Sequence, residues 1–289
     1  MGNPAGILRK GKDFFVAIDS DGCVFDTMEI KHKECFCPVT IRHYNLQAAS
    51  KYVRQAWEFV NLYSRQRGTN RFPALVAVMD LLRARPEVQQ RAVQIPVLKT
   101  LRSWIARESK LGNPALRQAA NSQAELEDVL QWSEAVNASV NSMVYGVPPF
   151  PYVDASLRKA AAQADLIVAS STPSEALRRE WTEHGLARYV RMIAGQETGS
   201  KVQQLARAAG QQYPPNRMLM IGDALGDLNA ARSAGASFYP ILPGQEELSW
   251  ERFFTEVLDR FFAGRYHGAY EKERVAELYA ALPENPPWT

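Results

Sequence analysis

The chain has 289 residues, 46% of them apolar and 22% charged, which is ordinary globular composition with room for two domains. Its net charge is only +3 and no run of five or six like charges occurs, so a nucleic-acid groove or a polybasic membrane patch is not indicated. No stretch approaches the roughly 18 apolar residues of a membrane span, and three cysteines cannot form a full disulfide framework. We therefore expect a cytoplasmic protein that acts on a small molecule, with no nucleic-acid or membrane partner.

The first predicted element is a buried strand over residues 14–18, which is rich in Phe, Val and Ile and runs directly into Asp19-Ser20-Asp21-Gly22. Side chains two apart on an extended backbone point the same way, so Asp19 and Asp21 can face one small volume. Two carboxylates that close repel each other, and the pKa of one rises unless a cation or an electrophile lies between them. Taken alone, the four residues fit an acidic turn equally well.

A long helical stretch follows. Apolar residues recur at helical spacing over residues 46–66, 74–82, 97–105 and 126–144. Ser122 and Glu125 predict a capping box at the start of the last helix, and the proline-rich run 148–151 ends the stretch. We predict that residues 29–149 form an inserted all-α domain.

From about residue 154 the pattern changes to short strands that alternate with helices. Strands are predicted over residues 166–169, 190–194, 218–221 and 237–242. Helices of about ten residues separate them, and two more helices, over 251–262 and 270–282, follow. This alternation predicts an α/β fold, a Rossmann-like doubly wound parallel sheet built from residues 1–28 and 150–289.

Two helix starts in this part of the chain carry capping signals. Thr172-Pro173-Ser174-Glu175 predicts a helix with Thr172 as its N-cap, a proline at the first position and a capping glutamate. Ser200 with Gln203 predicts a second capping box. Both helices would follow strands, where ligands of parallel sheets bind.

Polar groups follow three of these later strands. Ser170, with Ser171 beside it, stands before a capped helix and could bind an anion. Lys201 lies in a first helical turn, where the helix dipole disfavours a cation unless an anion is near. Gly222-Asp223 and Asp227 would place two carboxylates on one helix face. Taken singly, a turn serine and a solvated lysine are the ordinary alternatives.

In this order the four elements resemble the motifs of the haloacid dehalogenase-like superfamily, and the helical insert resembles that family's cap. The resemblance implies that Asp19 is a nucleophile that forms an aspartyl-phosphate and that Asp21 acts first as an acid and then as a base. It implies that Ser170 and Lys201 hold the phosphoryl oxygens. It also implies Mg²⁺, bound by Asp19, the Asp21 backbone carbonyl and Asp223, with Asp227 orienting a metal-bound water or Lys201.

Within that family Asp21 favours phosphoester chemistry, because dehalogenation needs no leaving-group acid. We expect hydrolysis of a small phosphorylated metabolite. Two alternatives remain open. Residues 26–32 also resemble the hinge of the sugar-phosphate mutases, although Lys31 takes the place of the hinge histidine and His32 comes one later. The third possibility is a catalytically idle phosphometabolite-binding protein.

Charge indicates residues of the insert that could contact the substrate. Arg65, Arg67 and Arg71 flank a predicted break between two helices and could hold the anionic remainder of the substrate, as could Lys31. The insert also carries His32, Cys35, Cys37 and His43, whose spacing resembles a zinc site, although ordinary packing is the favoured interpretation.

Overall fold

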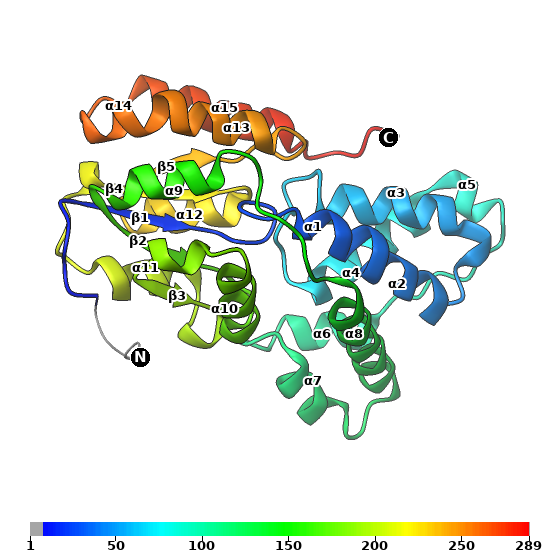
Figure 1. The fold of residues 1–289 in the computed structure, drawn as a ribbon. Helices are drawn as coiled ribbons and strands as arrows, with labels where there is room; N and C mark the ends of the chain where they lie inside the picture. The colour runs from blue at the N-terminus through cyan, green and yellow to red at the C-terminus, as the bar shows by residue number, and fades with distance from the viewer. Residues whose placement is uncertain (1–7, 289) are drawn as a thin grey trace. The chain divides into compact units, whose positions relative to one another are not determined.

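The computed structural model describes residues 8–288, which form two compact units (Figure 1). The α/β unit comprises the chain up to Thr27 together with Val147–Leu282. The helical unit comprises Met28–Gly146 together with the residues that follow Leu282. The prediction placed the whole carboxyl-terminal tail in the α/β core, whereas residues 283–288 belong to the helical unit.

A sheet of five parallel strands forms the centre of the α/β unit. In chain order its strands are β1 (Phe14–Ile18), β2 (Ala164–Ala169), β3 (Met192–Ala194), β4 (Met218–Gly222) and β5 (Ser237–Pro240). Their spatial order is β3-β2-β1-β4-β5. Every residue of β2, β4 and β5 is buried, as expected for strands that are covered on both faces. The predicted α/β fold with a parallel sheet is therefore confirmed.

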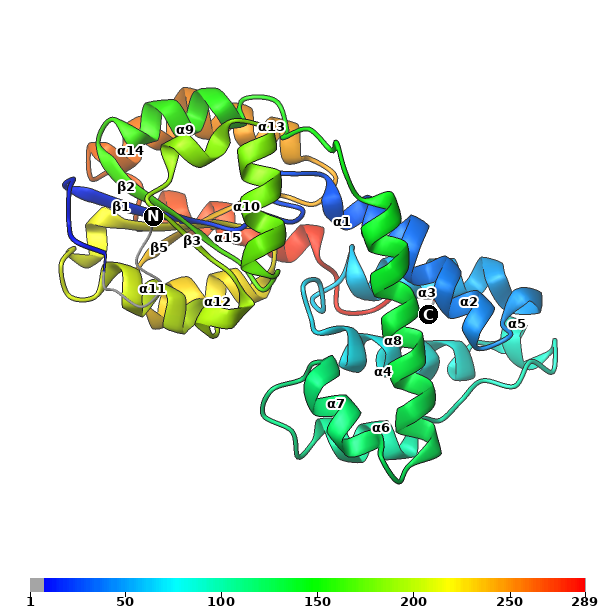
Figure 2. The ribbon, with the colours of Figure 1, turned by 60° about the horizontal axis from the view of Figure 1, so that its bottom comes forward.

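Helices cover both faces of this sheet (Figure 2). Val16 and Ile18 of β1 belong to one core, and Phe15 and Ala17 to the other, as the two-residue repeat of a strand requires. The first face packs against α9 (Val153–Ala161), α10 (Ser174–Glu183), α13 (Glu246–Arg252) and α14 (Leu258–Phe262); the second packs against α11 (Lys201–Ala209), α12 (Leu225–Ser233) and α15 (Ala269–Ala281). A π-helical turn, Phe253–Val257, joins α13 to α14.

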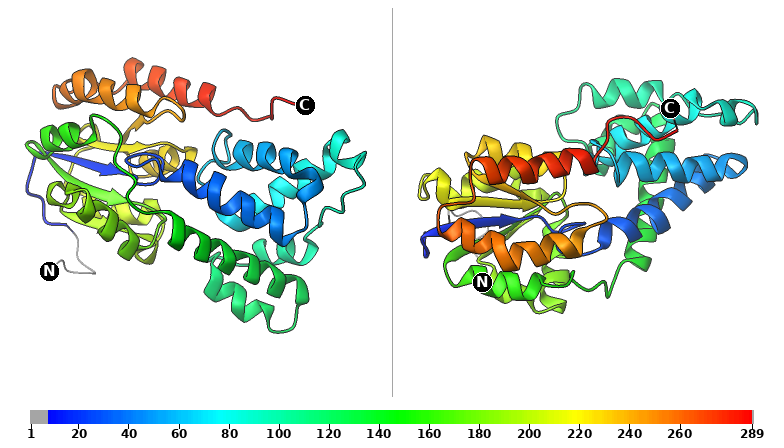
Figure 3. Two further views of the ribbon diagram at one scale, coloured as in Figure 1. Left: turned by 45° about the vertical axis from the view of Figure 1, so that its right-hand side comes forward. Right: turned by 90° about the horizontal axis from the view of Figure 1, so that it is seen from above.

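The helical unit has a core of its own around Trp57 and Trp132, both fully buried. Its helices are α1 (Thr27–Ile30), α2 (Cys37–His43), α3 (Ser50–Asn61), α4 (Arg71–Ala84), α5 (Pro86–Gln89), α6 (Lys99–Ile105), α7 (Asn113–Ala120) and α8 (Ala124–Met143), with a π-helical turn, Lys31–Phe36, between α1 and α2. They are the helices coloured from blue to green along this part of the chain in Figure 3. α3 is shorter than the predicted helix over 46–66. No helix among residues 8–288 is long and apolar enough to cross a membrane.

The predicted capping box at the start of α8 is wrong. The N-cap position is Gln123, which makes no side-chain cap bond, and Ser122 lies outside the helix. The Glu125 carboxylate instead accepts a hydrogen bond of 2.8 Å from the backbone nitrogen of Leu101 in α6. Glu125 therefore satisfies a backbone donor in the first turn of another helix, and a tertiary contact replaces the local one.

Candidate active site

Asp19, the residue directly after β1, lies in a cluster of three buried carboxylates with Asp223 and Asp227. One oxygen from each of the three side chains lies within 4.8 Å of the others. The register of the strands produces this meeting, because β1 and β4 are neighbours and the backbone nitrogen of Asp19 donates to the carbonyl of Ile221 at 3.0 Å. Asp19 is 6% exposed and Asp227 is 0% exposed, so water screens these charges poorly.

The approach of Asp227 to the cluster depends on Gly222. A Cβ atom on Gly222 would lie 2.4 Å from the Cβ of Asp227, so a side chain here would displace the carboxylate. The helix α12 begins only at Leu225, so Asp223 precedes it. The prediction that Asp223 and Asp227 share one helix face is therefore wrong in detail. Asp227 is instead held at the helix start, where its Oδ2 accepts from the backbone nitrogen of Ala224 at 3.2 Å.

Lys201 is the cation of this cluster. Its Nζ lies 2.7 Å from Asp19 Oδ2 and 2.5 Å from Asp227 Oδ1. Burial lowers the pKa of Lys201, but the charges of Asp19 and Asp227 outweigh burial and raise this pKa above its ordinary value. The predicted capping box of Ser200 and Gln203 is confirmed, and it fixes the first turn that carries Lys201.

The carboxylates remain short of positive charge despite Lys201. Burial raises the pKa of Asp19 to about 6, with Lys201 lowering it and Asp223 raising it further. Burial likewise raises the pKa of Asp227 to about 6, against the lowering effect of Lys201. One ammonium group cannot balance three buried carboxylates, so the site favours a further cation. Three hard carboxylate oxygens are a donor set that suits a divalent cation such as Mg²⁺.

The side chain of Asp21 is held by two hydroxyl groups. Thr27 Oγ1 donates to Oδ1 at 2.5 Å, and Thr172 Oγ1 donates to Oδ2 at 2.7 Å. Gly22 has a positive φ of 72°, and its nitrogen donates to the Phe25 carbonyl at 2.8 Å, which closes the turn that presents Asp21. The Asp21 side chain is thus outside the cluster of three, and the backbone-carbonyl role toward the metal stays a prediction.

The role predicted for Thr172 is wrong. The helix α10 begins at Ser174, and its N-cap position is Pro173, which makes no side-chain cap bond. The Thr172 hydroxyl binds Asp21 instead. The sequence did not predict this contact, because the capping pattern already accounted for the Thr172 hydroxyl as a helix N-cap.

Ser170 lies at the end of β2 and is joined to the elements around it by Gln204. The buried Gln204 Nε2 donates to the carbonyls of Ser170, Gly195 and Gly199 at 2.9, 2.9 and 3.0 Å. These contacts bring the ends of β2 and β3 to the start of α11. Gln204 was not predicted, although a glutamine on the apolar face of an amphipathic helix could have signalled it. Ser171, assigned to the substrate, is exposed beside Ser170.

The arginines assigned to the substrate have partners inside the helical unit. Arg71 Nη1 donates to the carbonyl and hydroxyl of Ser133 at 3.2 and 2.9 Å and to Asn137 Oδ1 at 2.7 Å. Burial lowers the pKa of Arg71 to about 10. Arg67 is buried and donates to the Leu62 carbonyl at 2.9 Å. Contact of these side chains with substrate stays a prediction, and the structure adds a competing role in the fold.

Arg65 and Lys31 were assigned to the substrate with them. Arg65 Nη1 lies 2.7 Å from Glu284 Oε2 in the tail of the same unit, and both side chains are well exposed. Lys31 opens the π-helical turn Lys31–Phe36. Their assignment to the substrate likewise stays a prediction.

The histidines and cysteines of the insert do not converge on a common point. Among residues 8–288, the cluster of Asp19, Asp223 and Asp227 is the one group of three or more such side chains with converging ligand atoms. His32 Nδ1 accepts from Trp57 Nε1 at 3.1 Å, and His43 Nε2 is hydrogen-bonded to Asp128 at 3.0 Å. These contacts agree with the packing interpretation.

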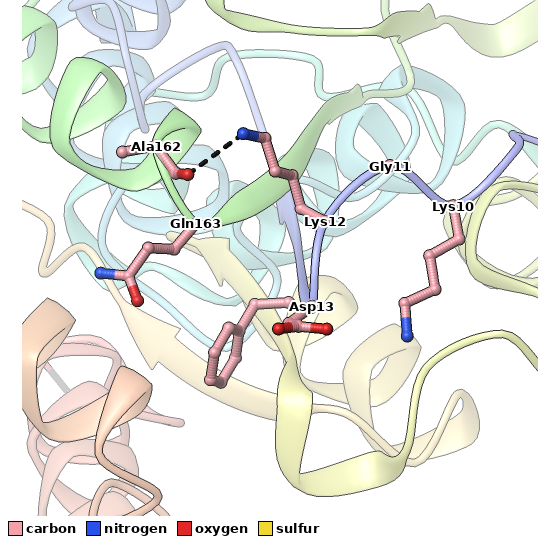
Figure 4. A pocket seen from close by; sticks show the side chains of 7 residues that line it. Lys10, Gly11, Lys12, Asp13, Ala162 and Gln163 are labelled. Carbon is pink, nitrogen blue, oxygen red and sulfur yellow. Dashed lines mark hydrogen bonds between the residues drawn. The ribbon is translucent and has the colours of Figure 1, made fainter.

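A surface hollow of about 500 Å³ lies at the other end of β1 (Figure 4). It is lined by Lys10, Gly11, Lys12, Asp13, Phe14, Ala162 and Gln163. Phe14 begins β1, whereas Asp19 follows its last residue. The hollow therefore lies at the amino ends of the strands and the carboxylates lie at their carboxyl ends. Lys12 Nζ donates to the Ala162 carbonyl at 3.2 Å across this hollow.

One family model matches part of the chain. A family model described as haloacid dehalogenase-like hydrolase matches residues 107–241, a segment that holds Ser170, Lys201, Asp223 and Asp227. No curated protein matches the chain.

Among solved structures the chain is similar to a putative phosphoglycolate phosphatase from Lactobacillus delbrueckii subsp. bulgaricus, with 15% identity, 93% of this chain and 100% of that chain covered, and a TM-score of 0.48. It is also similar to a haloacid dehalogenase-like hydrolase from Streptococcus pneumoniae, with 14% identity, 84% and 91% covered, and a TM-score of 0.43. A putative beta-phosphoglucomutase from Thermotoga maritima shares 16% identity, with 78% and 84% covered and a TM-score of 0.38. With TM-scores below 0.5, these likenesses carry no weight for the activity.

Proposed function

We propose that the chain is a magnesium-dependent phosphomonoester hydrolase of the haloacid dehalogenase-like family that works through an aspartyl-phosphate, and the family match over residues 107–241 supports this proposal. The observation that carries this proposal is the buried cluster of Asp19, Asp223 and Asp227 with Lys201 between two of its members. A dianionic phosphate group would be repelled by three carboxylates alone. With Lys201 and a divalent cation it becomes a favourable ligand of the same site.

Asp19 is the proposed nucleophile. Its Oδ1 accepts from the backbone nitrogen of Ser20 at 2.8 Å and its Oδ2 pairs with Lys201, so the carboxylate is fixed in direction before substrate arrives. Asp19, Asp223 and Asp227 would hold Mg²⁺, which supplies positive charge to the carboxylates and to the phosphoryl oxygens when bound. Lys201 and Ser170 would hold the remaining phosphoryl oxygens.

Asp21 is the proposed acid and base. In the first half-reaction an oxygen of Asp19 bonds to phosphorus while the bond from phosphorus to the leaving oxygen breaks, and the proton of Asp21 moves to that oxygen. In the second half-reaction a water oxygen bonds to phosphorus, the Asp19–phosphorus bond breaks, and Asp21 takes the proton of water. The enzyme returns to its starting state with alcohol and inorganic phosphate released.

A panel of phosphorylated metabolites, assayed for inorganic phosphate with Mg²⁺ and with EDTA, tests this function. We expect phosphate release that requires Mg²⁺ and is absent in Asp19→Asn. Conversion of a sugar phosphate to its isomer without release of phosphate would favour the mutase alternative. Binding without turnover across the whole panel would favour an idle phosphometabolite-binding protein.

A further inference from the structure

Thr27 and Thr172 reach the Asp21 carboxylate from opposite parts of the chain. Thr27 is fully buried and follows Asp21 by only six residues, so the turn that begins at Asp21 also delivers its hydroxyl. Thr172 lies 151 residues after Asp21, in the segment that follows β2. Its hydroxyl reaches Asp21 because β1 and β2 are neighbours in the sheet.

The backbone of Thr172 is held from two sides. Its nitrogen donates to Ser170 Oγ at 3.2 Å, and its carbonyl accepts from the nitrogen of Gln196 at 3.0 Å. Gly195 permits the second contact, because a Cβ at this position would lie 2.6 Å from the Thr172 carbonyl oxygen. The ends of β2 and β3 together therefore fix the direction of the Thr172 hydroxyl.

Building on the phosphatase activity proposed above, we propose that Thr172 is a positioning residue that orients the Asp21 carboxyl group for proton transfer in both half-reactions. Thr172 acts through Asp21 and is not itself a catalytic residue. The two hydroxyl contacts, one on each carboxylate oxygen, fix the plane of the carboxyl group. Proton transfer needs such alignment with the leaving oxygen and later with water.

A hydroxyl group suits this role because Asp21 must change its protonation state. Toward a carboxylate, the Thr172 hydroxyl donates its proton, as it does in this structure. Toward a protonated carboxyl, the same hydroxyl can rotate and accept. Threonine therefore holds Asp21 both as acid and as base, whereas a valine of nearly the same shape could do neither.

Two variants of Thr172 and one control test the proposal. Thr172→Val removes the hydroxyl, Thr172→Ser restores it, and Thr255→Val removes a hydroxyl that binds the Glu251 carbonyl on an exposed helix turn. Each enzyme is assayed on an alkyl phosphate, whose poor leaving group needs an acid, and on p-nitrophenyl phosphate, whose leaving group needs little help. The readouts are kcat, KM and the burst of nitrophenolate.

For Thr172→Val we expect kcat on the alkyl phosphate to fall about tenfold or more, the effect of losing one charge-assisted hydrogen bond, with KM little changed. On p-nitrophenyl phosphate the base-assisted second step becomes slower than the first, so a burst of nitrophenolate appears. Thr172→Ser should restore most of the activity on both substrates. Thr255→Val should behave as the wild type.

The absence of a burst with p-nitrophenyl phosphate, or a serine variant no better than valine, would overturn the proposal. Crystal structures provide a readout without turnover. In Thr172→Val the Asp21 carboxyl group should turn away from its wild-type direction, and an unmoved Asp21 would also overturn the proposal. If the wild type hydrolyses no phosphomonoester, the proposed function fails, while the crystal structures still decide whether Thr172 positions Asp21.

Discussion

In the α/β unit the buried carboxylates of Asp19, Asp223 and Asp227 face one another and the half-buried Lys201, whereas in the helical unit the half-buried guanidinium of Arg71 faces neutral groups. Three carboxylates share one ammonium in the first case. In the second, a single guanidinium donates to hydroxyl, carbonyl and amide oxygens. Burial shifts the pKa of a charged group in both units, raising that of Asp19 to about 6 and lowering that of Arg71 to about 10.

This difference in the partners of the charged groups distinguishes a functional site from a structural interaction. A cluster of like charges is unfavourable until a ligand of opposite charge enters it, so it is maintained for binding or chemistry. A buried charge with well-placed neutral partners stabilises the fold without any ligand. Removing a charge from the α/β cluster should therefore affect activity more than stability, and removing Arg71 should do the reverse.

The largest expected effect is that of Asp19→Asn. The amide is a poor nucleophile, so we expect turnover to fall about a thousandfold or more. Thermal unfolding without metal should show no loss of stability, because the variant relieves the repulsion between Asp19 and Asp223. Asp21→Asn is the matched control, and it should still form some aspartyl-phosphate from aryl phosphates. Wild-type turnover in Asp19→Asn would place the nucleophile elsewhere.

Arg71→Ala should show the opposite pattern. It leaves the acceptors on Ser133 and Asn137 without this donor and opens space over the Phe36 ring, whose centroid lies 5.1 Å from the guanidinium carbon. We expect unfolding in urea to show a loss of about 3 kcal/mol. Hydrolysis of an aryl phosphate should be unchanged at temperatures where the variant is folded.

Two outcomes decide between the roles of Arg71. The sequence-based expectation is that Arg67→Ala or Arg71→Ala weakens kcat/KM for the true substrate by about 2 kcal/mol while hydrolysis of an aryl phosphate changes much less. Unchanged stability together with that loss would assign Arg71 to the substrate. Arg65→Ala serves as the control for stability, since its exposed pair with Glu284 contributes about 0.5 kcal/mol or less.

Addition of Mg²⁺ should stabilise the α/β unit through its carboxylates. A ligand that binds only the folded state adds about 2.7 kcal/mol to the free energy of unfolding when its concentration is a hundred times its dissociation constant. We expect Mg²⁺ to raise the melting temperature of the wild type and to have little effect on Asp223→Asn. A shift of equal size in both proteins would show that the cation binds away from Asp223.

Asp165, at the amino end of β2, is a buried charge of the α/β unit whose own partners, one of them the cation Arg191, satisfy it without a ligand. Its carboxylate accepts from Tyr213 at 2.5 Å, from Arg191 at 2.5 Å, and from the nitrogens of Gly11 and Lys12 at 2.7 and 2.9 Å. Burial raises the pKa of Asp165, but the hydrogen bonds from Tyr213 and Arg191 outweigh burial and lower this pKa below its ordinary value.

The stability that Asp165 contributes should therefore depend on pH. Because its folded pKa is lowered, the contribution is fully present above the unfolded pKa of about 4 and is lost as pH falls through the folded value. We expect Asp165→Asn to be about 2 kcal/mol less stable than the wild type at pH 7, with the gap narrowing in acid. Urea unfolding of both proteins at pH 7 and at pH 3 measures this difference in stability. A difference that is the same at both pH values would contradict the role of the Asp165 carboxylate.

The convergence of charged groups in the α/β unit was predictable because strand ends in a parallel sheet meet by rule. Asp19, Lys201 and Asp223 each follow a strand, so their positions along the chain indicated their meeting in space. The contact of Thr172 with Asp21 could not be predicted, because it depends on the direction of one side chain across two strands. Local capping signals gave wrong predictions for Thr172 and for the pair of Ser122 with Glu125, because Thr172 and Glu125 bind tertiary partners instead.

The helical unit was predictable only as a set of helices. Periodicity located α4, α6 and α8 but says nothing of which helices pack together, so the inward direction of Arg71 was not foreseen. The packing of the tail against this unit could not be predicted either. Pro283 and Trp288 follow the last helix of the α/β unit without any pattern, yet the backbone nitrogen of Arg65 donates to the Pro283 carbonyl at 3.3 Å.

The smallest expected effect concerns this tail, which adds to the helical unit from outside its continuous sequence. The Trp288 ring packs edge-on against Phe59, with 5.7 Å between ring centroids, and the guanidinium carbon of Arg85 lies 4.7 Å from the Trp288 ring and 4.5 Å from the Tyr52 ring. Arg85 is thus held between two aromatic rings, and Trp288→Ala removes one of them. We expect a loss of about 1 kcal/mol in the free energy of unfolding, the combined value of one aromatic pair and one cation–π contact. Urea unfolding followed by circular dichroism measures the loss, with Glu284→Ala as an exposed control that should change stability by less than about 0.5 kcal/mol. If Trp288→Ala is as stable as this control, the tail contributes nothing to the helical unit, and the comparison of the two units would hold for the continuous segment 28–146 alone.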